Sequence, residues 1–318
     1  MRVAVLVLDG VFDSGLAVIL DTLETANALA DAGGRRSSRF EVVTCGLRRA
    51  ATTHHGLRIA LAPIAEAAPD VVIVPALGAK TVDTIAAALA RPDVADTTAL
   101  LRGWADGGAR IAGACTATFV LAASGILDGG SATTTWWLSP LFRERFPRVE
   151  LDESRMVVES SRVVTAGAAL AHVDLALWLV RRRSPSLAEV TARHLLFDAR
   201  PSQARYAMPD HLVHTDPLVE RFERWARRHL ASFSLAGAAR AAATSERTLE
   251  RRIRAVLGRT PLAYVQDLRV EEAVHRLQTT KQSIDEIAAA VGYQDGATLR
   301  TLLRKKTGRG LRQLRVPG

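Results

Sequence analysis

Cysteine is scarce in this sequence, with Cys45 and Cys115 the two present among 318 residues. Two cysteines cannot build a disulfide framework, and no Cys/His spacing suits zinc, so neither a disulfide scaffold nor a zinc-dependent fold is predicted. The adjacent pair His54-His55 would point in different directions on regular structure, which favours an exposed loop over a metal site. We therefore expect no metal and no cofactor.

Long apolar runs are also missing. The apolar stretch at residues 3–8 runs directly into Asp9 instead of continuing into a secretory apolar core. No apolar stretch approaches the roughly eighteen residues that a membrane-spanning helix needs. We expect a cytoplasmic protein with no membrane partner.

Excess charge is absent from the first two thirds of the chain. Residues 1–212 hold 22 basic and 22 acidic residues, whereas residues 213–318 hold 20 basic and 11 acidic residues. The whole net charge of +9 therefore lies in the last third. This asymmetry favours a nucleic-acid-binding module joined to a neutral domain. The apolar fraction of 48% is enough for two domain cores.

The basic third contains one sequence pattern twice. The repeated pairs are Thr248-Leu249 with Thr298-Leu299, Gly258-Arg259 with Gly308-Arg309, and Ser234-Leu235 with Ser283-Ile284. The first two are offset by fifty positions and the last by forty-nine, so one residue is inserted in the turn of the second copy. Each copy predicts a short helix, a tight turn and a second helix, which is helix-turn-helix spacing. Ser245 is expected to cap the second helix of the first copy, and Gly292 to end the first helix of the second copy.

The second helix of each copy has one apolar face. At about 100° per residue, Leu249, Ile253 and Val256 share a face of the first, and Leu299 and Leu303 share a face of the second. The opposite faces are basic, and Arg and Lys can reach base edges or phosphates in a major groove. A solvated face on an ordinary helical bundle is the alternative, which the repetition disfavours. The predicted DNA-binding residues are Arg247, Thr248, Glu250, Arg251, Arg254, Thr298, Arg300, Thr301, Arg304 and Lys305.

A long helix is predicted over residues 261–278, which at 1.5 Å per residue would hold the two copies roughly 25 Å apart. The region resembles the C-terminal DNA-binding domain of AraC/XylS-type transcriptional regulators, in TSERTLERRIRAVLGRTPLAYVQDLRV and SIDEIAAAVGYQDGATLRTLLRKKTG. Leu299 stands where that family commonly has an aromatic residue. The resemblance implies binding to double-stranded promoter DNA.

The first two thirds alternate short β-rich runs with helical stretches. Expected strands are residues 3–8, 40–45, 71–74, 111–113 and 163–165, and expected helices are residues 16–30, 117–123 and 170–182. Such alternation predicts a parallel sheet with helices on both faces, with ligands bound outside the carboxyl ends of the strands.

One of these carboxyl ends has the form of a nucleophile elbow. Cys115 lies among small residues between a strand and a helix, so a tight turn and a thiol pKa lowered by the helix N-terminus are expected. A buried, unreactive cysteine is the alternative. The loop at residues 75–78 is expected to add a hydrogen-bond donor to this site. The predicted ligand-binding residues are Asp13, Ser14, Gly78, Cys115, Thr116, Thr135 and Trp136.

Residues 1–183 resemble the class I glutamine-amidotransferase-like superfamily in its PfpI-type intracellular protease branch. More closely, they resemble the sensor half of AraC-type regulators, in VVIVPALG, GACTATFVLAASGILDGGSATTTWW and VVTAGAALAHVDLALWLV. The resemblance implies a doubly wound, flavodoxin-like α/β fold, a small nitrogen-containing effector, a homodimer, and activation through RNA polymerase. Catalytic members carry a histidine where this sequence has Thr135. Asp13 is displaced by two positions from their acidic residue, and His172 is assigned a structural role.

These patterns predict three segments: a sensor domain at residues 1–199, a proline-punctuated connector at 200–217, and an all-α domain with two helix-turn-helix motifs at 218–318. We interpret the chain as a one-component transcription regulator and not as an enzyme, because the threonine at the histidine position cannot act as a general base near pH 7. Two alternatives remain open. One is an active cysteine amidohydrolase or peptidase, and the other is a thiol-based redox sensor acting through Cys115.

Overall fold

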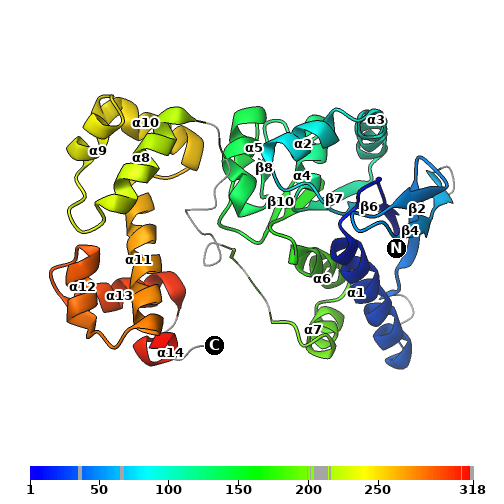
Figure 1. Ribbon diagram of the computed structural model, residues 1–318. Coiled ribbons are helices and arrows are strands. Elements are labelled where there is room, and N and C mark those ends of the chain that lie inside the picture. The colour runs from blue at the N-terminus through cyan, green and yellow to red at the C-terminus, as the bar shows by residue number, and fades with distance from the viewer. Residues whose placement is uncertain are drawn as a thin grey trace. The chain divides into compact units, whose positions relative to one another are not determined.

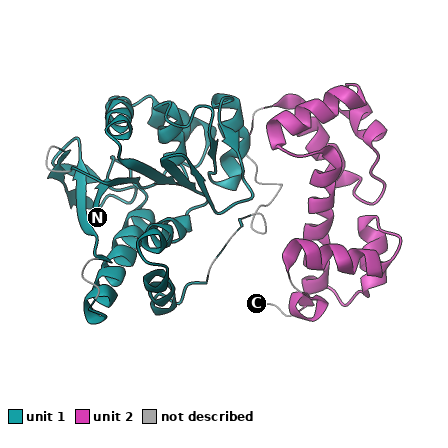
Figure 2. Ribbon diagram, turned by 180° about the vertical axis from the view of Figure 1, so that it is seen from behind, with its two compact units in different colours: residues 1–204 teal, residues 205–318 magenta. Residues whose placement is uncertain are grey.

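The computed structural model describes residues 1–34, 38–64, 68–198, 200, 202–203, 214, 216–308 and 310–315. It divides into two compact units, residues 1–204 and 205–318 (Figure 2). Most of the predicted connector, residues 200–217, lies outside the described residues. Its last residue, Pro217, already belongs to a helix, because a proline is favourable in the first turn and Asp216 caps that helix.

A mostly parallel sheet forms the centre of the first unit. Among the described residues this sheet has seven strands in the order β10-β11-β7-β6-β1-β2-β5, and every neighbouring pair is parallel except β10 with β11. The strands are β1 Arg2–Leu6, β2 Glu41–Gly46, β5 Ala62–Pro63, β6 Val71–Val74, β7 Arg110–Ala114, β10 Val157–Ser160 and β11 Val163–Ala166. The central strands read as apolar runs because both faces of the sheet are covered.

Helices cover both faces of this sheet (Figure 1). One face carries α1 Asp13–Ala32, α6 Ala171–Arg183 and α7 Pro185–His194; the other carries α2 Val82–Leu89, α3 Pro92–Asp106, α4 Ala117–Ala123 and α5 Ser139–Arg145. Short elements complete the unit: β3 Ala50–Thr52 with β4 Arg58–Ala60, β8 Ser131–Ala132 with β9 Glu150–Leu151, and a 3-10 helix, η3 Trp136–Leu138. The predicted doubly wound α/β fold is confirmed.

Helix α1 begins three residues earlier than the sequence pattern predicted. Asp13 occupies its first turn, where a carboxylate is stabilised by the exposed backbone N–H groups. Asp13 and Ser14 therefore lie in a helix and not in the loop after the first strand. The pattern missed this because both residues are polar and precede the first apolar position of the helix.

The second unit is helical throughout its described residues. Its helices are α8 Pro217–Arg228, α9 Leu235–Ala241, α10 Glu246–Leu257, α11 Pro261–Thr279, α12 Ile284–Val291, α13 Gly296–Thr307 and α14 Leu311–Arg315. Helices α8 to α10 form one apolar core with the first half of α11, while α12 to α14 form another with its second half. The predicted long helix is α11, and the division between the cores falls between Leu268 and Val270.

The two copies of the repeat follow the same backbone path. In each copy, the residue nine positions after the first N-cap serine is left-handed, namely Ala243 (φ 55°) or Gly292 (φ 89°). The N-cap of the second helix follows two positions later in the first copy, at Ser245, and three positions later in the second, at Asp295. The inserted residue therefore lies in the turn, as predicted.

Candidate nucleic-acid interface and effector site

Helix α10 has a buried apolar face and an exposed polar face. Ser245 caps it by accepting a hydrogen bond from the Thr248 backbone N–H (3.3 Å), as the sequence predicted. Leu249, Ile253 and Leu257 are buried, while Val256 is only half-buried. The exposed residues predicted to bind DNA on this helix are Arg247, Glu250, Arg251 and Arg254.

Helix α13 repeats this arrangement. Asp295 caps it by accepting a hydrogen bond from the Thr298 backbone N–H (2.7 Å), and Leu299 and Leu303 are buried. The predicted DNA-binding residues of this helix are all exposed, namely Thr298, Arg300, Thr301, Arg304 and Lys305.

The cationic side chains on these two faces have no partners within the described part of the chain. Among the described residues, none makes an ion pair or a hydrogen bond with the side chains of Arg247, Arg251, Arg254, Arg300, Arg304 and Lys305. Neighbouring cations that face other elements are neutralised: Arg252 pairs with Asp216, and Arg259 and Lys306 pair with Asp267 (2.9 and 2.7 Å). Positive charge that is unpaired among the described residues therefore lies where the sequence predicted DNA contacts.

The predicted threonines are less available than the cations. The Thr248 hydroxyl accepts a hydrogen bond from the Ser245 hydroxyl (3.0 Å), and the Thr298 hydroxyl donates to Asp295 (3.0 Å). Thr301 donates to the backbone carbonyl of Ala297, one turn back (3.1 Å). These hydroxyls hold the helices in shape, which leaves the cations as the principal groups for an anionic partner.

In the first unit, Cys115 adopts the backbone conformation expected of a nucleophile elbow. Its φ of 56° lies in the left-handed region, which a residue with a side chain enters only under constraint. The constraint comes from two hydrogen bonds: its N–H donates to Ala166 O (2.9 Å), and its carbonyl accepts from the Thr134 hydroxyl (2.7 Å). Cys115 therefore ends β7 in a sharp turn before α4.

The thiol of Cys115 does not have the lowered pKa that the sequence predicted. Burial raises the pKa of Cys115 to about 11, although the Thr116 backbone N–H and the Thr135 hydroxyl both act to lower it. The residue is 5% exposed, and α4 has only seven residues with which to stabilise a thiolate. Desolvation of the charged form outweighs the helix N-terminus. The expected low pKa is wrong.

Thr135 lies beside the thiol in the position of the missing histidine. Its hydroxyl is buried and has no hydrogen-bond partner among the described residues. Its effect on the thiol pKa therefore reflects proximity and not an aligned hydrogen bond. A buried hydroxyl without a partner is available to a ligand.

The loop at residues 75–78 offers no free donor, contrary to expectation. Pro75 has no N–H, and the N–H groups of the other three residues are already bound. They donate to His172 Nε2 (3.0 Å), to Thr116 Oγ1 (2.9 Å) and to Gly10 O (2.9 Å). The Thr116 hydroxyl also donates to Leu77 O (2.7 Å), so Thr116 holds this loop and is not free for a ligand.

His172 has a structural environment. Its Nε2 accepts the Ala76 N–H, and its Nδ1 faces Ala169 O, which places the proton of the neutral ring on Nδ1. Burial lowers the pKa of His172 to about 4. Gly15 packs against the ring, where a Cβ would approach within 2.8 Å. The imidazole is therefore fully engaged and does not serve as a base for Cys115.

The other predicted pocket residues are dispersed around the strand ends. Asp13 is already engaged by other side chains: it accepts a hydrogen bond from the Thr53 hydroxyl (2.5 Å) and pairs with His55 (2.8 Å). Burial raises the pKa of Asp13, but these hydrogen bonds outweigh it and hold the pKa at about 2. Ser14 is exposed, the His54 ring covers Gly78, and Trp136 is buried edge-to-face with Trp137 (5.5 Å).

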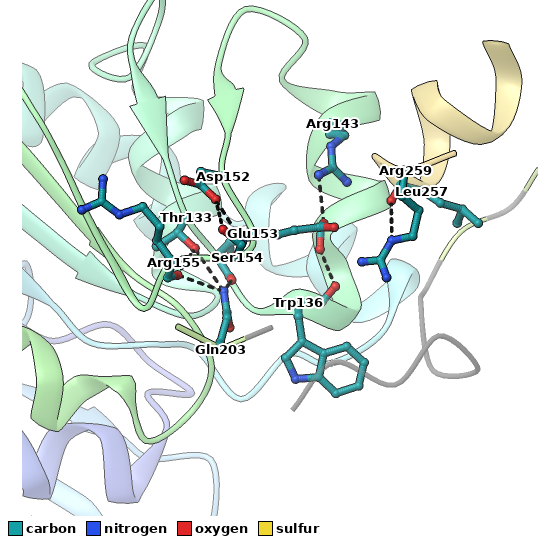
Figure 3. A network of polar contacts seen from close by, with 12 residues as sticks. Thr133, Trp136, Arg143, Asp152, Glu153, Ser154, Arg155, Gln203, Leu257 and Arg259 are labelled. Atoms are coloured by element: carbon teal, nitrogen blue, oxygen red, sulfur yellow. Dashed lines mark hydrogen bonds and ion pairs between the residues drawn. The ribbon is translucent and has the colours of Figure 1, made fainter. Parts of the chain in front are cut away.

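One residue near this site was missed by sequence reasoning. Gln203, in the proline-punctuated segment, is fully buried within the first unit and donates to Thr133 Oγ1 (3.1 Å; Figure 3). It also donates to Thr134 O (2.8 Å). A lone glutamine among prolines carries no sequence signal of burial. Its position depends on a chain return that no local pattern encodes.

The described parts of the chain contain neither a cluster of metal ligands nor a membrane-spanning helix. No group of three or more His, Cys, Asp or Glu side chains there could hold a metal ion. None of the described helices combines the length and the apolarity needed to cross a membrane.

Two protein families match this chain. The DJ-1/PfpI family matches residues 1–182, more than half of the 318 residues, and a helix-turn-helix domain family matches residues 238–316. The chain belongs to the DJ-1/PfpI family. The predicted resemblances to PfpI-type domains and to AraC-type regulators are confirmed.

Curated relatives of this DJ-1/PfpI protein are named as regulators. The HTH-type transcriptional regulator CdhR of Pseudomonas aeruginosa is 28% identical over 197 residues, covering 59% of this chain and 57% of its own. The HTH-type transcriptional regulator GlxA of Rhizobium meliloti is 30% identical over 216 residues, covering 64% and 65%. The chain thus spans less than two thirds of the length of these relatives.

Solved structures share the fold of the DJ-1/PfpI part. An AraC family transcriptional regulator from Pseudomonas putida is 22% identical, with a TM-score of 0.50, covering 61% of this chain and 98% of that one. Drosophila melanogaster DJ-1beta is 20% identical, with a TM-score of 0.50, covering 62% and 98%. At these identities the likeness concerns the fold alone.

Proposed function

We propose that this DJ-1/PfpI protein is a transcriptional regulator whose helix-turn-helix unit binds promoter DNA and whose first unit binds a small-molecule effector. The observation that carries the proposal is the set of cations on the exposed faces of α10 and α13 that have no partner in the described part of the chain. Guanidinium and ammonium groups without carboxylate partners remain available for phosphates and for guanine edges.

The length of α11 supports simultaneous contact by both copies. Its 19 residues span about 28 Å, which approaches the roughly 34 Å that separate successive major-groove segments on one side of B-DNA. Apolar cores join each copy to its own half of α11. We infer that α10 and α13 read two consecutive groove segments.

The test is substitution of one arginine in each second helix. Arg251→Ala and Arg304→Ala should each cost about 1–3 kcal/mol of binding free energy if the side chain makes a bidentate base contact. The measurement is a gel shift at fixed salt, on an operator selected from a random duplex library. Arg102→Ala, which removes an exposed arginine of α3, changes the net charge equally and should leave affinity unchanged.

Two outcomes of this experiment are informative beyond the loss itself. A phosphate contact would weaken all sequences alike and would lower the salt dependence by about one counterion. Operator affinity in the Arg251→Ala, Arg304→Ala double variant that equals the wild-type value would remove both residues from the interface.

The effector part of the proposal rests on a site that can bind and is poorly suited to turnover. The left-handed Cys115 is the one feature that favours a hydrolase. Against it stand the raised thiol pKa, the threonine in place of a base, and a histidine whose ring nitrogens are already engaged. The unpartnered Thr135 hydroxyl supports binding of an effector through an oxygen acceptor. The same buried, high-pKa thiol disfavours the redox-sensor alternative, because the thiolate is the form that is oxidised.

A further inference from the structure

We propose that Gln203 is a latch that holds the start of the connector against the effector site, and that a ligand beside Cys115 releases it. What the latch controls rests on the proposed regulatory function. The contacts that form it lie entirely within the first unit, and they can be tested without DNA or effector.

Gln203 is anchored through both its side chain and its backbone (Figure 3). Its Nε2 donates to Thr133 Oγ1 (3.1 Å), to Thr134 O (2.8 Å) and to Arg155 O (3.4 Å). Its backbone N–H donates to Ser154 O (2.9 Å), and the preceding residue pairs with Arg155 as an antiparallel bridge. Such complete burial is unusual for a residue in a connecting segment, which normally runs over the surface.

The residues that hold Gln203 also hold the elbow. Thr134 accepts from Gln203 through its carbonyl and donates to Cys115 O (2.7 Å) through its hydroxyl. On the other side, the carboxamide of Gln203 packs on Gly167, where a Cβ would lie 2.5 Å from Oε1. Gly167 directly follows Ala166, whose carbonyl accepts the Cys115 N–H (2.9 Å). Gln203 and Cys115 are therefore connected in two ways: through Thr134, which contacts both, and through the adjacent residues Ala166 and Gly167.

The latched arrangement leaves two buried polar atoms without partners. Gln203 Oε1 and the Thr135 hydroxyl both lack hydrogen bonds among the described residues. Each unpaired buried group destabilises the state that contains it. A ligand that binds the Thr135 hydroxyl and displaces Thr134 or Gly167 would weaken the hold on Gln203, and the freed carboxamide would regain partners in water.

The coupling must be reciprocal. If occupancy beside Cys115 favours release of Gln203, then release of Gln203 favours access to Cys115 by the same factor. This gives two measurements on the full-length protein, one at the connector and one at the thiol.

The first measurement is tryptic cleavage after Arg205, two positions beyond Gln203. Gln203→Glu keeps the side-chain length, removes both amide donors and places a carboxylate against three oxygen acceptors. We expect cleavage to accelerate about tenfold, because the cleavage rate follows the population of the released state. Ser202→Ala is the control; it removes the neighbouring hydroxyl, which donates to Ser154 O (2.6 Å), and because this hydrogen bond is exposed the rate should change by no more than about two- to threefold.

The second measurement is alkylation of Cys115 by iodoacetamide, read by mass spectrometry. In Gln203→Glu we expect Cys115 to react about tenfold faster, while Cys45, buried in β2, serves as the internal reference and keeps its rate. Conversely, wild-type protein already alkylated at Cys115 should be cleaved faster after Arg205. If Gln203→Glu fails to fold by circular dichroism, Gln203→Met takes its place, since it fills the same space without polar atoms.

The outcomes separate the latch from the regulatory function. Unchanged cleavage after Arg205 together with unchanged alkylation of Cys115 in a folded Gln203 variant overturns the latch. Faster cleavage and faster alkylation in a protein that binds no selected operator would support the latch and defeat the proposed regulator.

Discussion

Cys115 combines a constrained backbone with an unreactive thiol. A left-handed backbone at a non-glycine residue costs on the order of 1 kcal/mol. The conformation persists at Cys115 because Ala166 O accepts its backbone N–H and the Thr134 hydroxyl donates to its backbone carbonyl. Burial then raises the thiol pKa to about 11. The elbow therefore keeps the shape that serves nucleophilic enzymes while the environment of the sulfur opposes their chemistry.

Replacing this thiol tests whether the first unit performs chemistry. Cys115→Ala should leave DNA affinity in the absence of effector nearly unchanged, because Cys115 is buried within the first unit whereas the proposed DNA contacts belong to α10 and α13 of the second. Panels of amidase, peptidase and glyoxalase substrates should show no rate that depends on Cys115, since no base is present to contribute the usual rate gain of about 10²–10⁴. Turnover that disappears in Cys115→Ala would make the hydrolase the better interpretation.

His172 should make the first unit less stable in weak acid. Its folded pKa of about 4 lies below the unfolded value of roughly 6.5, so between these values the unfolded chain binds more protons and stability falls as pH is lowered. Between pH 7.5 and pH 5 the free energy of unfolding of the first unit should fall by about 2 kcal/mol. Above about pH 6.5 the neutral His172 should no longer reduce this free energy.

This pH effect can be measured by urea unfolding. A Trp225→Phe background leaves tryptophans only in the first unit, so their emission reports that unit alone. His172→Gln removes the imidazole and should flatten the dependence between pH 7.5 and pH 5. A slope that survives in His172→Gln would assign the effect to another group. Asp13 does not interfere, because its lowered pKa affects stability only as pH falls below about 4.

At the scale of elements, α11 is the part that relates the two helix-turn-helix copies. Asp267 lies next to the division between the two apolar cores and forms an ion pair with one residue of each copy. These residues are Arg259, just after α10, and Lys306, in the last turn of α13. The Asp267 side chain is 20% exposed, so these pairs are partly shielded from solvent and weigh more than surface pairs do. One carboxylate thus fixes both second helices relative to α11.

Asp267→Asn should weaken binding to an operator with two groove segments more than binding to either segment alone. We expect a loss of about 1 kcal/mol specific to the complete operator, because each copy keeps its own core while their relative orientation loosens. Gel shifts on complete and half operators measure this difference. Glu272→Gln, which breaks one pair with Arg276 on the same helix, is the charge-matched control. Equal losses on complete and half operators would show that Asp267 does not set the geometry.

At the scale of the whole molecule, the net positive charge and a separate pair of apolar cores fall in the same part of the chain, the second unit. Among the described residues, the two cores of the second unit are built from residues between Leu218 and Leu314, and the net charge of +9 lies in the same region of the chain. Each unit therefore carries what it needs to fold.

A fragment from Pro209 to Gly318 should fold and bind the selected operator without responding to any effector. Circular dichroism tests the folding, and a gel shift beside the full-length protein tests the affinity. The same fragment carrying Arg251→Ala is the control for specific binding. A soluble, helical fragment with no operator affinity would contradict the assignment of DNA recognition to this unit.

The sequence by itself determined the helical repeat and the positions of its caps. Apolar spacing, N-cap residues and turn glycines act over a few residues, so Ser245 and Gly292 occupy the roles that their local sequence indicates. The alternation of strands and helices predicted a parallel sheet with helices on both faces for the same reason, whereas the order of the strands is a property of the tertiary structure. The unequal distribution of charge is a property of composition and needed no fold.

The tertiary structure alone decided the chemistry of the first unit. The thiol pKa of Cys115, the occupied N–H groups of the 75–78 loop and the burial of Gln203 all depend on residues far apart in sequence, such as Leu77 with Thr116 or Gln203 with Thr133. Burial and pairing of this kind arise when the sheet brings its strand ends together. No local pattern encodes them, because each depends on where the rest of the chain has already folded.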